Sequence, residues 1–227
     1  MKVKISLAIK LSILTTLIVI ITTIITGSLT YVRQKEQTLK YIKAGLEIHA
    51  DTAALQIDGD THERAWKKRT SDSEEFQKLK KILNQIFQKN KAKGFEYKNF
   101  YTFRKVGNNM EFVIMLHPQS FIGDKYQIKK EMLPVLNGKV NVSTGIYTDQ
   151  YGTWISAYSP IRNSENKVVG ILEVDYQADV PLSEIRKDLV KIFLYGLLGI
   201  AISIVFSLIA AHIFLRPVKR LTNVAEH

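Results

Sequence analysis

Apolar residues are distributed very unevenly along the chain. Residues 11–30 contain no charged side chain, and residues 192–215 form a second apolar run in which His212 and Tyr195 are the only titratable groups. A helix rises about 1.5 Å per residue, so about 20 residues cover roughly 30 Å, the thickness of the hydrocarbon core of a bilayer. The pattern predicts transmembrane helices over residues 11–31 and 191–215, with the lipid bilayer as a partner.

The ends of these two runs predict how the chain lies in the membrane. Basic residues precede the first run and follow the second, so the positive-inside rule places residues 1–10 and 216–227 in the cytoplasm. Residues 32–190 then lie outside it, in a two-pass protein of the plasma (inner) membrane. A cleaved signal peptide is the alternative for the first run. About 20 apolar residues exceed the roughly 7–15 of a signal-peptide core, which favours an anchor.

The first part of the domain between the runs shows a helical pattern. Over residues 39–57 apolar side chains recur every three or four positions, which predicts a long helix that continues out of the first run. This helix is expected to end at the Asp-Gly-Asp turn of residues 58–60. A second helix is expected from Ser71, with Glu74 as its capping partner. The face of this second helix expected to be buried consists of Phe76, Leu79, Leu83 and Ile86.

After Gly94 the pattern becomes that of strands. Residues 95–104 and 110–116 are rich in aromatic and β-branched residues and are joined by a Gly-Asn-Asn turn, which predicts a hairpin. A short helical pattern over residues 128–136 ends at an Asn-Gly pair, and a final helix from Asp179 leads into the second apolar run. Three further strands are expected over residues 144–149, 151–162 and 167–176. The order predicts an α+β domain with one antiparallel central sheet of about five strands.

Composition and motifs narrow the function. The chain has no cysteine, which excludes disulfides, thiolate nucleophiles and Cys-ligated metals. Residues 31–190 carry 25 Lys and Arg against 20 Asp and Glu, spread along their length, so we expect no nucleic-acid partner. No nucleophile elbow, phosphate loop, zinc-protease pair or dinucleotide fingerprint occurs, so we expect no catalysis and no cofactor. Solvated turn residues, rather than metal ligands, are expected at Asp58, Asp60, His62 and Glu63.

The second half of the domain carries a recognisable motif. Residues 147–161 read YTDQYGTWISAYSPI, and residues 170–175 read GILEVD. Together they resemble the C-terminal half of single-Cache (extracellular PAS-like) sensor domains, and the resemblance covers about residues 33–185. Tyr151 stands where many members of that family have Trp. Shorter pieces similar to the same family lie at residues 57–63, 101–104 and 121–126.

A second resemblance follows the second apolar run. Residues 216–222 read RPVKRLT and resemble the opening of a HAMP signalling helix. Only the first part of a HAMP unit is present, so we expect the sequence to stop inside that element. The chain is then either the front part of a longer receptor or a truncated product.

The sensor resemblance implies a PAS-like fold with a long N-terminal helix, a homodimer, and a small-molecule ligand on the sheet face under that helix. Arg104 can clamp a carboxylate or phosphate, and Asp175 can pair with an amine, so the expected ligand bears a carboxylate or an amine. Alternation along a strand gives Trp154, Ser156 and Tyr158 one face. The alternative is that the aromatic residues only fill the core and that Arg104 lies on the surface. The implied ligand-binding residues are Tyr101, Arg104, Trp154, Ser156, Tyr158 and Asp175.

The two resemblances together imply transmembrane signal transduction. A ligand bound outside would shift the membrane helices and, through the HAMP element, a cytoplasmic output domain. That output is expected to be a nucleotide cyclase, a diguanylate cyclase, a phosphatase, a histidine kinase or a chemoreceptor. The alternatives are a non-sensing dimerisation module of a membrane enzyme and a membrane-anchored binding protein.

Overall fold

The chain forms two compact units in the computed structural model. One unit, here called the helical unit, comprises Met1–Gln37 and Leu182–His227, and the other, the sheet unit, comprises Thr38–Pro181. The motif residues Gln150 and Tyr151 lie outside the described residues. The structure describes residues 7–91, 97–139, 142–149 and 152–225.

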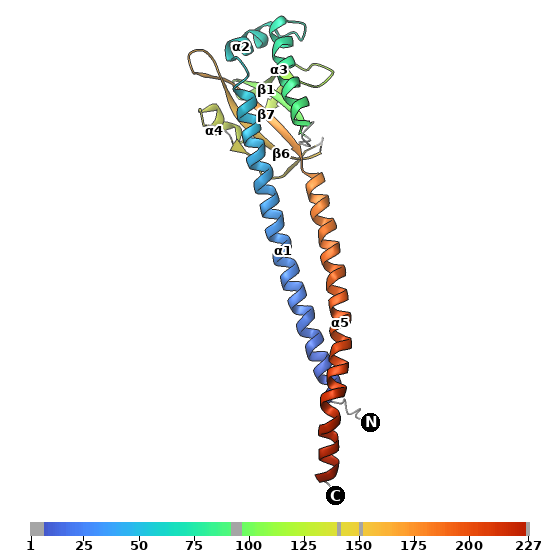
Figure 1. The fold of residues 1–227 in the computed structure, drawn as a ribbon. Helices are drawn as coiled ribbons and strands as arrows, with labels where there is room; N and C mark the ends of the chain where they lie inside the picture. Colours follow the sequence, from blue (N-terminus) through green and yellow to red (C-terminus); the bar gives the residue numbers. More distant parts are fainter. Residues whose placement is uncertain (1–6, 92–96, 140–141, 150–151, 226–227) are drawn as a thin grey trace. The chain divides into compact units, whose positions relative to one another are not determined.

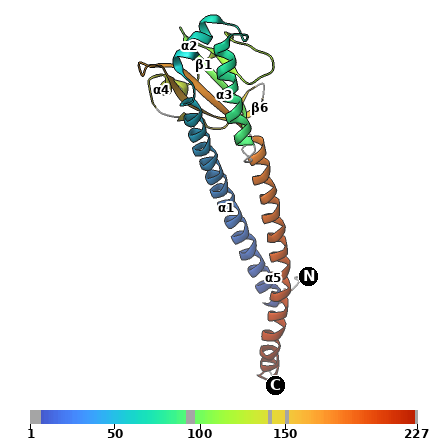
Figure 2. The same cartoon turned by 45° about the horizontal axis from the view of Figure 1, so that its top comes forward.

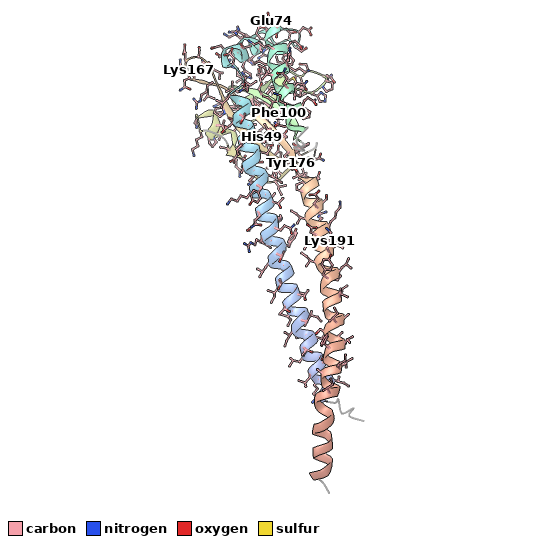
Figure 3. All side chains as sticks on the ribbon, viewed as in Figure 1. His49, Glu74, Phe100, Lys167, Tyr176 and Lys191 are labelled. Carbon is pink, nitrogen blue, oxygen red and sulfur yellow. The ribbon has the colours of Figure 1, made fainter. Side chains whose placement is uncertain are left out.

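The helical unit pairs the first part of α1 (Leu7–Ala54) with most of α5 (Asp179–Ala225) (Figure 1). Each helix contains a stretch that is long and apolar enough to cross a membrane, and large apolar side chains project outward along both (Figure 3). The pairing is close, because a Cβ added to Gly196 would lie 2.6 Å from Thr23 Cγ2. Thr15 Oγ1 also donates a hydrogen bond to Ser207 Oγ at 3.1 Å. Small residues and a polar contact therefore join two helices whose outer surfaces suit lipid.

A helix that the sequence did not predict follows α1 directly. α1 ends at Ala54, and α2 (Gly59–Lys68) begins inside the segment expected to be a turn. Asp58 has an extended backbone, and its carboxylate accepts a hydrogen bond from the Thr61 N–H at 3.1 Å. This is the geometry of a helix N-cap. The Asp-Gly-Asp segment therefore starts a helix, and α1 ends four residues before Asp58.

The next helix, α3 (Glu74–Lys91), begins later than expected. The predicted start at Ser71 is wrong, because Ser73 caps the helix by accepting a hydrogen bond from the Phe76 N–H at 3.3 Å. The predicted buried face is confirmed in large part, with one residue at its edge half-buried. Fully buried are Phe76, Leu79 and Leu83, and half-buried is Ile86.

The strands form one antiparallel sheet in the order β3-β2-β1-β7-β6-β4, with β5 also paired to β6. The predicted α+β class and antiparallel sheet are confirmed. The structure has seven strands rather than about five, because β3 and β4 are too short to show alternation in the sequence. The strands are β1 (Tyr97–Val106), β2 (Asn109–Met115), β3 (Lys125–Gln127), β4 (Val142–Ser143), β5 (Tyr147–Asp149), β6 (Gly152–Arg162) and β7 (Val168–Gln177).

One face of the sheet, here called the helix face, packs against α1, α2 and α3. Ser159 on β6 donates a hydrogen bond to Asp51 Oδ1 on α1 at 2.6 Å. Thr102 Oγ1 on β1 lies 2.9 Å from Nε2 of the buried His62 on α2. Figure 2 shows α2 and α3 side by side over the strands. The odd-numbered residues of β6 around Ser159 therefore point toward the helices.

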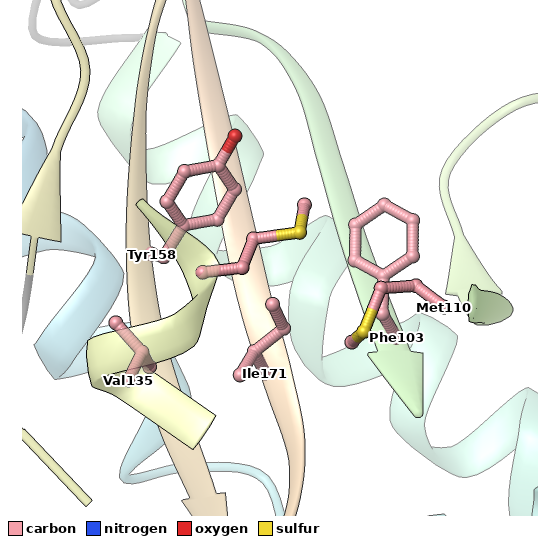
Figure 4. Close-up of a cluster of buried hydrophobic side chains, with 6 residues drawn as sticks. Phe103, Met110, Val135, Tyr158 and Ile171 are labelled. Carbon is pink, nitrogen blue, oxygen red and sulfur yellow. The ribbon is translucent and has the colours of Figure 1, made fainter. Parts of the chain in front are cut away.

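The opposite face, here called the α4 face, is covered in part by the short helix α4 (Met132–Leu136). Its core is a cluster of buried side chains contributed by four strands and α4 (Figure 4). Because Tyr158 belongs to this cluster, Ser156 and Tyr158 point away from α1 and do not lie under the long helix, where the sensor resemblance implies the ligand. The cluster consists of Phe103, Met110, Met132, Val135, Tyr158 and Ile171.

Candidate ligand-binding site

Two buried carboxyl groups lie together on the α4 face, where β6 pairs with β7. Ser156 lies directly opposite Asp175, and its Oγ donates a hydrogen bond to Asp175 Oδ1 at 2.6 Å. One pair further along, Tyr158 lies opposite Glu173, and its Oη donates to Glu173 Oε1 at 2.9 Å. All four side chains are buried. A core that only packs needs no such groups, because burying a carboxyl group is costly.

Aromatic side chains from the neighbouring strands surround this pair of carboxyl groups. Tyr147 Oη on β5 lies 2.7 Å from Ser156 Oγ. Since the Ser156 hydroxyl donates to Asp175, Tyr147 donates to Ser156, and a chain of hydrogen bonds runs from the phenol to the carboxylate. Tyr126 on β3 stacks with its ring centroid 5.2 Å from that of Phe103. The site therefore consists of two carboxyl groups surrounded by aromatic rings.

The ammonium group of Lys129 lies inside the same site. Lys129 belongs to the connection between β3 and α4, and its Nζ lies 3.7 Å from Glu173 Oε1. Nζ also lies 3.9 Å from the centroid of the Tyr147 ring and 5.2 Å from that of Tyr126. This nitrogen is buried, and within the described part of the chain it has no hydrogen-bond partner.

The electrostatics of the site favour protonated acids. Burial, followed by the charge of the nearby Asp175, raises the pKa of Glu173 to about 8. Burial and the neighbouring carboxylates also raise the pKa of Tyr126, Tyr147 and Tyr158. Glu173 is therefore mainly protonated near neutral pH and the tyrosines carry no charge. A cation that enters the site would favour the ionised form of Glu173.

Five of the six sequence-predicted residues share the α4 face. Ser156 and Asp175 are in contact, Tyr158 lies beside them bonded to Glu173, and the shared face of Trp154, Ser156 and Tyr158 is confirmed. Trp154 Nε1 donates a hydrogen bond to Asp149 Oδ1 at 3.0 Å at the end of β6. Tyr101 lies on the same face of β1, with its ring centroid 5.4 Å from that of Phe112.

Arg104 is not brought together with the other five. It lies on the helix face, where its Nη1 donates to Glu63 Oε1 at 2.9 Å. Its guanidinium carbon lies 4.2 Å from the centroid of the Trp66 ring on α2. A hollow of about 320 Å³ lies beside Arg104 and Glu63. Arg104 and Lys129 thus belong to different faces of the sheet.

Two residues of the segment 58–63, for which metal binding was the alternative, have structural roles. Asp58 caps α2, and His62 is fully buried, so the expectation of a solvated turn is wrong for His62. Burial, and then the charge of Arg104, lower the pKa of His62 to about 3, and the imidazole is therefore neutral. Among the described residues, no group of three or more Asp, Glu or His side chains is arranged to hold a metal ion.

Sequence reasoning missed Glu173, Lys129, Tyr126 and Tyr147. Glu173 stands two residues before Asp175 in the quoted GILEVD segment, so strand alternation alone gives both the same face. Tyr147 opens the YTDQYG segment, which indicates the domain family but gives this tyrosine no role of its own. Lys129 lies in a connecting segment, where no periodic pattern indicates the direction of a side chain.

Comparison with known proteins adds a distant likeness. No family model matches the chain, and no curated protein matches it. One matching solved structure is the ligand-binding domain of a Campylobacter jejuni chemoreceptor in complex with 4-methylisoleucine. It is 16% identical, the match covers 83% of this chain and 64% of that one, and the TM-score is 0.37. The chain is similar to chemoreceptor ligand-binding domains.

A second match belongs to the same class. It is the ligand-binding domain of a Pseudomonas aeruginosa amino acid chemoreceptor in complex with GABA, 12% identical, covering 68% of this chain and 60% of that one, with a TM-score of 0.40. The chain thus spans 60–64% of the length of these two structures.

Proposed function

We propose that this chain is the sensory and membrane part of a transmembrane receptor, and that the α4 face of its sheet unit binds a small molecule. One observation carries the proposal. Glu173, Asp175 and Lys129 bring two carboxyl groups and an ammonium group together among aromatic rings, and the ammonium nitrogen is buried without a hydrogen bond in the described structure. Groups with perturbed ionisation that cluster in this way are typical of functional sites.

The membrane arrangement proposed here follows from the sequence. The apolar stretches of α1 and α5 span the membrane, the basic ends lie in the cytoplasm, and the sheet unit lies outside. Ligand binding acts on a cytoplasmic output through the HAMP-like segment of residues 216–222. To change a population from 1:99 to 99:1, a ligand must favour one conformer by about 5.5 kcal/mol. The output is one of the cyclase, phosphatase, kinase or chemoreceptor classes named above.

The proposed receptor is a homodimer. On the part of α1 that belongs to the sheet unit, Tyr41 and Ile48 are 77% and 63% exposed, and Leu55, in the turn directly after the helix, is 85% exposed. They recur every seven residues, which is the spacing of a helix–helix seam. Large apolar side chains at that spacing, on the outer side of a helix whose inner side is buried, suit the same helix of a second copy.

The seam can be tested by cross-linking, because the chain has no native cysteine. In oxidised membranes, Ile48→Cys should give a disulfide-linked dimer. Asn108→Cys, at the exposed tip of the β1–β2 hairpin, is the matched control and should stay monomeric. Equal yields from both variants, or none from Ile48→Cys, would contradict the proposed seam.

Ligand binding can be tested with the full chain in lipid nanodiscs. We expect one or more compounds in a panel of small carboxylates, amines and amino acids to raise its melting temperature. At 100 times Kd the stabilisation is about 2.7 kcal/mol. Asp175→Asn should abolish the shift, whereas Arg104→Ala, which changes the helix face, should retain it. If no compound shifts the wild type, the non-sensing dimerisation module becomes the better account.

A further inference from the structure

Lys129 occupies a favourable place for a cation without being well bonded there. An ammonium group that bonds a carboxylate directly lies about 2.7–2.9 Å from the oxygen, but Lys129 Nζ lies 3.7 Å from Glu173 Oε1. A lysine ammonium has three hydrogens to donate, and none of them finds an acceptor in the described structure. The Lys129 ammonium is therefore held by electrostatic attraction and not by hydrogen bonds.

The surroundings of Lys129 Nζ suit a cation better than an anion. The nitrogen lies 3.9 Å from the centroid of the Tyr147 ring, and ring faces attract cations. Glu173 and Asp175 both lie on the α4 face of β7, joined to Tyr158 and Ser156. A carboxylate ligand placed here would face two carboxyl groups, whereas a second ammonium could take the position of the first.

Lys129 is also placed so that it can leave. It lies on the connection between the end of β3 at Gln127 and the start of α4 at Met132, and its side chain is 24% exposed. A lysine carries its charge on a flexible four-carbon stem. Its ammonium can therefore move into water by side-chain rotation, with the sheet unchanged.

We infer that the ligand of the α4-face site carries an ammonium group, and that this group displaces the Lys129 ammonium from the position beside Tyr147 and Glu173. The inference rests on the proposed function and names its ligand class. Lys129 acts as an internal competitor for the ligand. If the resident ammonium fills the position nine-tenths of the time, the apparent affinity for the ligand falls about tenfold.

The test uses the full chain in nanodiscs and two probes of equal length and opposite charge, n-butylammonium and butyrate. Binding is followed by the fluorescence of the two tryptophans, Trp66 and Trp154, both of which lie in the sheet unit. Removing the competitor in Lys129→Met should tighten n-butylammonium binding about tenfold. Lys130→Met is the matched control, because the neighbouring Lys130 side chain is 89% exposed, and it should bind like the wild type.

The possible results separate this inference from the proposed function. If Lys129→Met binds n-butylammonium no more tightly than the wild type does, the inference is overturned. Butyrate binding that is lost in Lys129→Met would also overturn it, because Lys129 would then hold an anionic ligand. In both cases the proposed function stands if another compound of the panel binds. If no compound binds either protein, the proposed function fails as well. Lys129→Gln repeats the test should the methionine variant fold poorly.

Discussion

The pH dependence of folding tests whether Glu173 is buried as a neutral acid. Burial raises the pKa of Glu173 to about 8, against an ordinary value of 4.5. The folded chain therefore binds more protons than the unfolded chain between these values, and the free energy of unfolding should fall as pH rises through them. Glu173→Gln removes the titrating group, while the amide oxygen can still accept the Tyr158 hydrogen bond.

The effect is best isolated between pH 6.5 and 8. At pH 6.5 the folded chain holds the Glu173 proton and the unfolded chain does not, whereas at pH 8 the folded chain has released about half of it. Integrated over this window, the wild type should lose about 2 kcal/mol of unfolding free energy. His62 acts in the opposite direction at lower pH. Its pKa is lowered to about 3, so its contribution to the free energy of unfolding increases between about pH 3 and 6.5. Above pH 6.5 this contribution is nearly complete.

The measurement is urea unfolding of the full chain in nanodiscs at pH 6.5, 7.2 and 8.0, followed by tryptophan fluorescence. Trp66 and Trp154 are the only tryptophans, so the signal reports the sheet unit. The wild type should lose about 2 kcal/mol across the window, whereas Glu173→Gln should change little. Parallel curves for the two proteins would refute the account of Glu173 as a buried neutral acid.

Two further predictions follow from the same contacts. A Cβ on Gly59 would lie 2.3 Å from the Arg162 carbonyl oxygen, so Gly59→Ala should lower the unfolding free energy by about 1–3 kcal/mol in the same urea assay. Gly145→Ala, where no atom lies within 4 Å, should be nearly neutral, and equal losses would contradict the close packing of α2. For the ligand, n-butylammonium adds a positive charge beside Glu173 in Lys129→Met, which favours ionised Glu173, so its affinity for this variant should increase by up to about tenfold for each pH unit as the pH rises towards 8. A titration series should find this slope absent once Glu173→Gln is added to Lys129→Met, and a slope that persists would point to another group.

Long or strongly alternating segments could be predicted from the sequence. The apolar runs give the two long helices, and strand alternation gives Trp154, Ser156 and Tyr158 one face of β6, whereas the grouping of Asp175 with them came from the sensor resemblance. α2 escaped prediction because its buried residues are small or polar, namely Gly59, Thr61, His62 and Ala65. A helix buried through such residues leaves no apolar period in the sequence.

The candidate site likewise contains residues that could be predicted from the sequence and residues that could not. Tyr101 and Arg104 are three residues apart on β1, so strand alternation already gives them opposite faces, and the grouping of Arg104 with the site came from the sensor resemblance and from its chemistry. Glu173 was open to the same alternation argument through its neighbour Asp175. Lys129 was not, because its position depends on how the connection between β3 and α4 folds over the sheet.

The location of a bound ligand tests the central claim most directly. Hydrogen exchange of the full chain in nanodiscs should be measured with and without the compound that raises the melting temperature most. We predict added protection in residues 126–136 and in the segments of β5, β6 and β7 that contain Tyr147, Ser156 and Asp175. Protection confined to α2 and the surroundings of Arg104 would contradict a binding site on the α4 face.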